Sequence, residues 1–183
     1  MTPCRLHITG ASGAGTTTLG RALATAWSVP HADTDDYFWV PTSPPYTTKR
    51  DVPQRLGLMR EVFLGRAAWV LSGTLMEWGE PLVEHLDAVV FLSVDHNLRM
   101  DRLHDREVLR YGSSIAAGGP REEAHREFID WADGYEDPEF DGRNRAQHEQ
   151  WLSALTCPVV QLDSSRGVDE LVAAIVSFEP PFA

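Results

Sequence analysis

Residues 8–19 read ITGASGAGTTTL, an apolar run that ends in a glycine-rich turn and leads into a helix-forming segment. The spacing of Gly10, Gly15 and Thr17 matches the frame G-x-x-x-x-G-K-[ST], in which backbone N–H groups surround phosphate oxygens. Thr16 stands where that frame has its lysine. The stretch predicts a phosphate-binding loop (P-loop) between a first strand and a first helix; the alternative is a glycine-rich turn without a ligand.

The loop retains the other parts of an anion site. Its three glycines let the backbone turn, and the N-terminus of the following helix adds its dipole. A hydrogen bond to a charged group contributes about 1.5–3 kcal/mol, so loss of the lysine weakens binding roughly ten- to a hundredfold without abolishing it. We therefore expect ATP to be bound by Gly10, Ala11, Ser12, Gly13, Ala14, Gly15, Thr16, Thr17 and Thr18, with Mg²⁺ on the Thr17 hydroxyl.

The charge and composition exclude several classes of protein. A formal net charge of −11 argues against binding to a nucleic-acid polymer, whereas a small anionic ligand needs only a local positive site. Lys49 is the only lysine. Cys4 and Cys157 are too few for a disulfide framework or a zinc site, and we expect buried free thiols. No signal peptide or membrane-spanning apolar run is visible, which indicates a cytoplasmic protein with no membrane partner.

Short β-rich runs alternate with helical stretches along the chain. Strands are expected at residues 4–9, 29–33, 69–72, 87–94 and 158–162, and helices at 17–27, 53–65, 96–110 and 168–178. The run at 87–94 is almost entirely apolar, as expected for a strand buried on both faces of a parallel sheet. This order predicts an α/β P-loop NTPase fold with a doubly wound, five-stranded parallel sheet.

Residues 111–151 do not fit the alternation. They are polar, contain glycine, and include two probable helices at 122–131 and 145–155. The segment is too long for an ordinary connection, which indicates a functional or mobile excursion. We therefore predict a single domain over 1–183, with a core of 1–110 and 152–183 and an extended, lid-like helical insertion at about 111–151.

Acidic residues follow the second expected strand, in the sequence Asp33-Thr34-Asp35-Asp36. Ligands of open parallel sheets collect outside the carboxyl ends of the strands, so these acids should lie beside the phosphates. Carboxylates there can hold Mg²⁺ or take the proton of an acceptor hydroxyl. A solvated turn is the alternative, chiefly for Asp36. Asp95, at the end of the fourth strand, is better placed to cap the next helix than to bind the metal.

These motifs resemble those of P-loop small-molecule and nucleotide kinases. The Asp-x-Asp after the second strand is similar to that of shikimate and gluconate kinases, and the lysine-free loop resembles that of archaeal-type cytidylate kinases. Over nearly its whole length the chain also resembles a bacterial group labelled adenylate kinase or AAA family ATPase, through ASGAGTTTLG, DTDDYFW, PP-x-TTKR and GR-x-R-x-x-HE-x-W. The resemblance implies that Asp33 serves the Mg²⁺ shell and that Asp35 contacts the acceptor.

The resemblance also implies where positive charge arises. The helix at 96–110 would lead into the lid and present Arg102 and Arg106 to the phosphates, with Arg99 expected on a surface stripe. Arg143 and Arg145 would come from the lid, and Lys49 from the acceptor side; a solvated loop is an equal alternative for Lys49. Further expectations are Arg166 at the adenine or in a simple turn, and helix-surface positions for His125 and His148.

Together these features predict a kinase that transfers the γ-phosphate of ATP, with Mg²⁺, to a small acceptor: a nucleotide, a nucleoside or a hydroxyl-bearing metabolite. The predicted catalytic residues are Asp33, Asp35, Lys49, Arg102, Arg106, Arg143 and Arg145. The alternative is a non-catalytic nucleotide sensor or an NTPase with a degenerate P-loop. An NTPase acting on a macromolecule would need a basic docking patch, which the sequence does not show.

Overall fold

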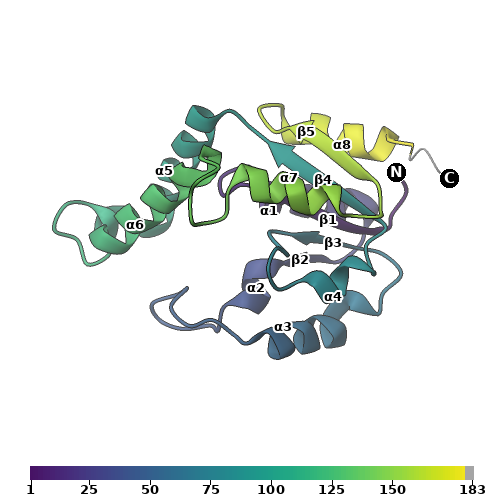
Figure 1. Ribbon diagram of the computed structural model, residues 1–183, viewed down its shortest axis with the longest axis horizontal. Coiled ribbons are helices and arrows are strands. Elements are labelled where there is room, and N and C mark those ends of the chain that lie inside the picture. The colour runs from purple at the N-terminus through teal and green to yellow at the C-terminus, as the bar shows by residue number, and fades with distance from the viewer. Residues whose placement is uncertain (180–183) are drawn as a thin grey trace.

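The computed structural model describes residues 1–179 and contains one five-stranded sheet (Figure 1). Its strands run in the order β2-β3-β1-β4-β5, and every neighbouring pair is parallel. The bounds are β1 (Arg5–Gly10), β2 (His31–Asp33), β3 (Trp69–Ser72), β4 (Ala88–Ser93) and β5 (Val159–Asp163). The predicted fold class, a doubly wound parallel α/β sheet of the P-loop NTPase kind, is confirmed.

Helices cover both faces of this sheet. One face packs on α1 (Thr16–Trp27) and α8 (Val168–Ser177), and the other on α3 (Val52–Met59), the π-helical turn η1 (Arg60–Leu64), α4 (Glu80–Val83) and α7 (Arg145–Ser153). The five apolar residues of β4 are at most 4% exposed. Burying each larger apolar side chain contributes about 1.5–3 kcal/mol, so both layers of helices are held by the hydrophobic effect.

Strand β1 shows why the two faces differ. Leu6 and Ile8 belong to the cluster under α1 and α8, whereas His7 and Thr9, which alternate with them in the sequence, are buried polar residues. Because side chains alternate across a strand, His7 and Thr9 point to the opposite face. There the His7 ring packs edge-on against the ring of Trp151 in α7, and the two ring centres lie 6.0 Å apart. The strand that leads into the P-loop therefore carries polar side chains toward α7.

Several elements differ from the sequence-based expectation. The helix expected at 53–65 is α3 followed by the π-helical η1. A short helix, α2 (Thr34–Phe38), was not expected, because it begins directly after β2 within the acidic motif. The Asp33 side chain caps α2 by accepting a hydrogen bond from the Asp35 N–H at 3.1 Å. Asp95 caps α5 (His96–Tyr111), as predicted, by accepting from the N–H groups of Asn97 and Leu98.

The segment after α5 consists of η2 (Gly112–Ile115), α6 (Glu122–Asp133), η3 (Gly134–Glu136) and α7. In Figure 1, α6 projects away from the sheet, on the same side as the loop between α2 and α3. Helix α7 instead returns to the sheet, where Leu152 joins the buried cluster of α3 and α4. A movable lid at 111–151 stays a prediction, and the packing of α7 indicates that its last helix belongs with the core.

The thiols of Cys4 and Cys157 are free, as expected, but half-buried rather than buried. Burial raises the pKa of the Cys4 thiol to about 11, so it stays protonated near neutral pH. Among the residues that the structure describes, no helix combines the length and apolar character needed to cross a membrane.

Candidate active site

The P-loop joins β1 to α1 and depends on its glycines. Gly13 and Gly15 have φ values of 90° and 91°, in the left-handed region that side chains rarely adopt. Gly13 also lies so close to α5 that a Cβ atom there would be 2.8 Å from the Arg99 carbonyl oxygen. Gly15 is the N-cap of α1, and Thr16 is the first helical residue. The loop thus has the backbone shape and the helix N-terminus that bind phosphate.

Thr17 and Asp33 meet beside this loop. The Thr17 hydroxyl donates a 2.6 Å hydrogen bond to Asp33 Oδ2, and the Ser72 hydroxyl donates to the same oxygen at 3.0 Å. Asp33 is therefore held in place from α1 and from the end of β3. No group of three or more histidine, cysteine or acidic side chains that would form a metal cage occurs within residues 1–179. One hydroxyl and one carboxylate instead fit Mg²⁺, which is commonly held by one or two carboxylates plus substrate phosphates.

Asp35 lies in the first turn of α2, where its side chain remains accessible from the surface. Partial removal of its carboxylate from water raises the pKa of Asp35, and the neighbouring Asp33 raises it further. Arg143 and Arg106 act in the opposite direction. A carboxylate with a raised pKa, close to Asp33 and to two guanidinium groups, has the chemistry needed to accept a proton.

Two arginines from distant segments converge on Ser12 of the P-loop. Arg99, at the start of α5, donates from Nη1 to the Ser12 carbonyl oxygen at 3.3 Å. Arg143, just before α7, donates from Nη2 to the Ser12 hydroxyl at 3.1 Å. Burial lowers the pKa of both guanidinium groups, although arginine stays charged in proteins. The P-loop therefore has positive charge beside it in spite of Thr16.

The expectation that Arg99 lies on a surface stripe is wrong. Its side chain is 1% exposed, because α5 packs against the P-loop through the face that carries Arg99. Arg99 also lies over the Tyr135 ring, with 5.3 Å from Cζ to the ring centroid. The sequence places Arg99 and Arg102 on one helix, but it does not show which of them faces the loop.

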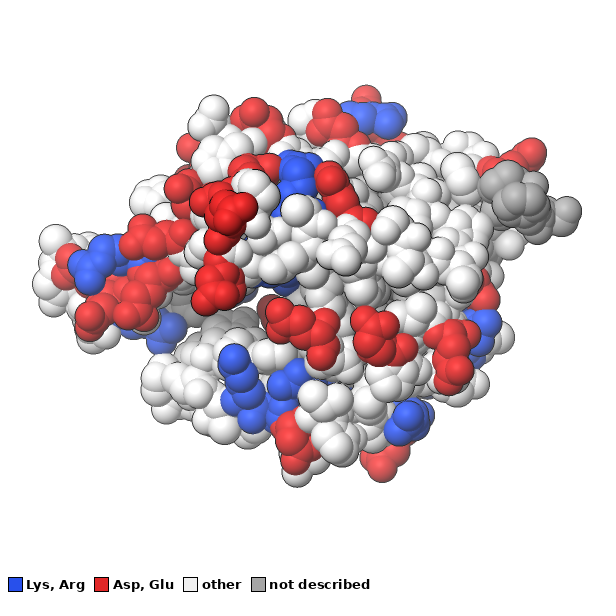
Figure 2. Space-filling model, in the orientation of Figure 1, with Lys and Arg blue, Asp and Glu red and all other residues white. Residues whose placement is uncertain are grey.

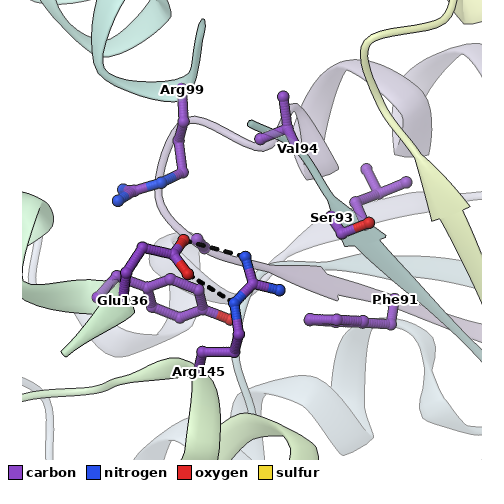
Figure 3. A pocket seen from close by; sticks show the side chains of 9 residues that line it. Phe91, Ser93, Val94, Arg99, Glu136 and Arg145 are labelled. Atoms are coloured by element: carbon purple, nitrogen blue, oxygen red, sulfur yellow. Dashed lines mark hydrogen bonds and ion pairs between the residues drawn. The ribbon is translucent and has the colours of Figure 1, made fainter. Parts of the chain in front are cut away.

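The other predicted arginines do not contact the P-loop through a hydrogen bond in the described part of the chain, although Arg106 lies near enough to Asp35 to lower its pKa. Arg145 forms two hydrogen bonds with the Glu136 carboxylate, at 2.6 and 3.0 Å (Figure 3). Arg102 donates to the Ser164 carbonyl oxygen at 2.8 Å, in the turn after β5. Arg106 pairs with its neighbour Glu107 at 3.4 Å.

Two further candidates lie in exposed positions. The Lys49 ammonium lies 5.7 Å from the centre of the Phe38 ring, at the start of the acceptor-side region. Arg166, in the turn before α8, has its Nε atom 3.5 Å from the carboxylate of Glu170 in the first turn of that helix. Within the described residues, neither side chain contacts the P-loop.

The expectation that His148 lies on a helix surface is also wrong. His148 is fully buried, with Nε2 2.9 Å from the Thr9 hydroxyl and Nδ1 3.1 Å from the Tyr135 hydroxyl. Burial lowers the pKa of His148 to about 3, so the ring is neutral near pH 7. The polar residues His7 and Thr9 inside an otherwise apolar strand are the sequence signal for a buried polar partner. His125 is half-buried, 3.8 Å from Glu107.

Two shallow depressions lie where these elements meet, and neither has room for a water molecule. The first is lined by the end of β4, Ala11 of the P-loop, Arg99, Tyr135 and the Glu136–Arg145 pair (Figure 3). The second lies between Ser12, Arg99 and Arg143. The segment from η3 to α7 is thus closely packed over the phosphate loop.

Solved structures with a similar chain trace define the class of fold. A shikimate kinase from Bacteroides thetaiotaomicron aligns over 94% of this chain and 95% of its own, with a TM-score of 0.54 and 19% identity. A gluconokinase from Sinorhizobium meliloti 1021 aligns over 93% of this chain and 88% of its own, with a TM-score of 0.51 and 19% identity. The chain therefore has a P-loop kinase-like fold.

A relative close in sequence shows the family. The uncharacterized protein YqaC of Bacillus subtilis (strain 168) is 38% identical over 173 residues, which cover 94% of this chain and 96% of YqaC. The chain belongs to the same family as YqaC, whose name states no activity. No family model matches the sequence.

Proposed function

We propose that this protein is a Mg²⁺-dependent kinase that transfers the γ-phosphate of ATP to a hydroxyl group of a small acceptor. The observation that carries the proposal is the 2.6 Å contact between the Thr17 hydroxyl and the Asp33 carboxylate, with Asp35 two residues further along. A loop that only bound phosphate would not need a hydroxyl and a carboxylate placed to hold a metal ion, with a second, accessible carboxylate beside them. The kinase-like fold supports the same class of reaction.

In this mechanism the backbone N–H groups of the P-loop would hold the phosphates, and Thr17 and Asp33 would hold the metal. Mg²⁺ would neutralise charge on the phosphate oxygens. The acceptor oxygen forms a bond to the γ-phosphorus while the bond from that phosphorus to the β–γ bridging oxygen breaks, which releases ADP. Asp35 accepts the proton of the acceptor hydroxyl, which is the role its raised pKa suits.

The acceptor would enter between the two projecting parts of the molecule. Figure 2 shows a hollow between the helical excursion and the part that carries α2 and α3, with Lys and Arg atoms visible around it. Asp35 lies on this side of the P-loop, at the start of α2. A nucleotide, a nucleoside or a non-nucleotide metabolite remains a candidate, and the acids of this region favour an acceptor with hydroxyl groups.

The experiment combines ATP labelled on the γ-phosphate with a panel of nucleosides, nucleoside monophosphates and sugar acids. The wild-type protein should transfer label to one class of acceptor only with Mg²⁺ present. Asp35→Asn should lower the transfer rate by about 10²–10⁴-fold, the usual contribution of a positioned base, while ATP affinity stays within a few fold. Asp36→Asn, the neighbouring acid, is the matched control and should retain the rate.

A nucleotide sensor is the alternative, and the absence of a lysine at Thr16 is the feature that favours it. Tight Mg²⁺-dependent binding of ATP, with neither transfer to any acceptor nor hydrolysis, would show a sensor rather than a kinase.

A further inference from the structure

The charges around Ser12 are unbalanced. Neither Arg99 nor Arg143 has a carboxylate oxygen within the 4.0 Å ion-pair distance among residues 1–179. Arg99 is buried and Arg143 is half-buried, and the more distant carboxylates of Asp35 and Glu77 favour the charged form of Arg143. Glu136, whose charge favours the charged form of Arg99, is already held by two hydrogen bonds from Arg145. Buried charges in proteins are normally paired or bind a ligand, so two guanidinium groups without a close carboxylate are suited to bind an anion.

The unused donors point to the same conclusion. The Nε atoms of Arg99, Arg106 and Arg143 are buried and have no hydrogen-bond partner within the described residues, and of these three residues Arg99 and Arg143 contact Ser12. Arg99 is 1% exposed and cannot turn to solvent to satisfy its donor. A buried donor without a partner costs free energy, and such groups occur where a ligand completes the site.

Aromatic rings hold both guanidinium groups in place. The Arg143 guanidinium lies 5.3 Å from the Trp131 ring centre, and that of Arg99 lies 5.3 Å from the Tyr135 ring centre. Stacking on a ring fixes the plane of a guanidinium without using its N–H donors. The two groups are therefore positioned on the loop with donors still available.

The other cations are less suited to serve the phosphates. Arg145 and Arg106 already pair with glutamates, and Arg102 donates to the turn after β5. Lys49 lies exposed on an aromatic ring at the acceptor side. Arg143 alone among the predicted candidates combines a contact to the P-loop with freedom from a carboxylate partner in the described part of the chain.

We infer that Arg143, with Arg99 beside it, takes the place of the lysine that the P-loop lacks at Thr16 and binds the phosphates of the nucleotide. This inference rests on the proposed function, because it identifies the cation of the same site. Arg143 is the group expected to touch the phosphates. Arg99 is a positioning residue that also contributes charge, since it holds the Ser12 carbonyl from inside the fold.

The first test measures affinity for ATP with Mg²⁺ by calorimetric titration. Arg143→Gln should weaken binding by about ten- to a hundredfold, the effect of one charged hydrogen bond. Arg143→Met keeps the apolar stem of the side chain on Trp131 and should weaken ATP binding by the same factor. This variant replaces the glutamine variant in the test if the latter does not fold. Arg126→Gln, on the exposed surface of α6, is the matched control and should bind like the wild type. Unchanged affinity in both Arg143 variants would overturn the inference.

The second test restores the lysine. Thr16→Lys in the Arg143→Gln background should recover most of the lost affinity, because the charge returns to its ordinary place in the motif. Thr16→Met in the same background adds similar length without charge and should restore nothing. A purely structural role of Arg143 could not be repaired from Thr16. If neither the lysine nor the methionine variant recovers ATP binding, the proposal that Arg143 takes the place of the lysine is rejected.

The two proposals fail in different ways. If the wild type binds ATP and the Arg143 variants lose it, but no acceptor receives phosphate, the kinase proposal fails and the replacement of lysine stands. If transfer occurs and the Arg143 variants bind ATP normally, only the replacement fails.

Discussion

The imidazole Nε2 of His148 lies 2.9 Å from the hydroxyl of Thr9, and both side chains are buried. This contact joins α7 to β1, the strand that runs directly into the P-loop. On its other side His148 meets the Tyr135 hydroxyl at 3.1 Å, and the Tyr135 ring supports Arg99. A neutral, fully enclosed histidine therefore connects the sheet, the phosphate loop and the arginine that lies on it.

The buried histidines predict how stability depends on pH. Burial lowers the pKa of His148 to about 3 and that of His7 to about 4, so the unfolded chain binds more protons than the fold below about pH 6.5. Their contribution to the free energy of unfolding is therefore complete above that pH and is lost as the pH falls. His148→Gln should reduce the acid-side slope by up to about 1.4 kcal/mol per pH unit. Denaturant unfolding between about pH 4 and pH 7 measures it.

The half-exposed His85 provides the control for this measurement. His85→Gln should leave the slope as in the wild type, because folding does not enclose its side chain as it does those of His7 and His148. An unchanged slope in the His148 variant would contradict the buried, neutral assignment.

The Thr17–Asp33 contact predicts how ATP binding depends on the metal. Asp33→Asn keeps the size of the side chain but removes the charge, so Mg²⁺ should enhance ATP affinity about tenfold less than in the wild type. Titrations with Mg²⁺ and with excess chelator separate this effect from binding by the loop itself. Asp36→Asn should retain the full enhancement. Equal enhancement in both variants would show that Asp33 serves only as the cap of α2.

The close approach of α5 to the P-loop predicts an asymmetry between two glycines. Gly13→Ala adds a side chain at a positive φ and 2.8 Å from the Arg99 carbonyl, so it should destabilise the fold by about 1–3 kcal/mol and weaken ATP binding. Gly57→Ala, in α3 with open space around it, should instead stabilise by about 0.5–1 kcal/mol. Thermal unfolding of the two variants gives the comparison, and equal shifts would contradict the packing of α5 on the loop.

The sequence predicted those features that depend on near neighbours in the chain. The order of strands and helices, the turn at Gly13 and Gly15, and the cap at Asp95 follow from short patterns, and the structure contains them. The short helix α2 escaped prediction because it takes its first residues from the acidic motif after β2. The burial of His148 escaped prediction because α7 alone, with charged residues around it, reads as an exposed helix.

For this protein, the sequence by itself determined the sheet, the phosphate loop and the missing lysine, because hydrophobic period, glycine spacing and residue identity are local properties. Only the tertiary structure decided which arginines lie on the loop. Arg143 reaches Ser12 across 131 positions of the chain, and Arg145, two residues further on, pairs with Glu136 instead. That difference depends on how α5, η3 and α7 pack together over β1 and β4, which no spacing within the sequence encodes.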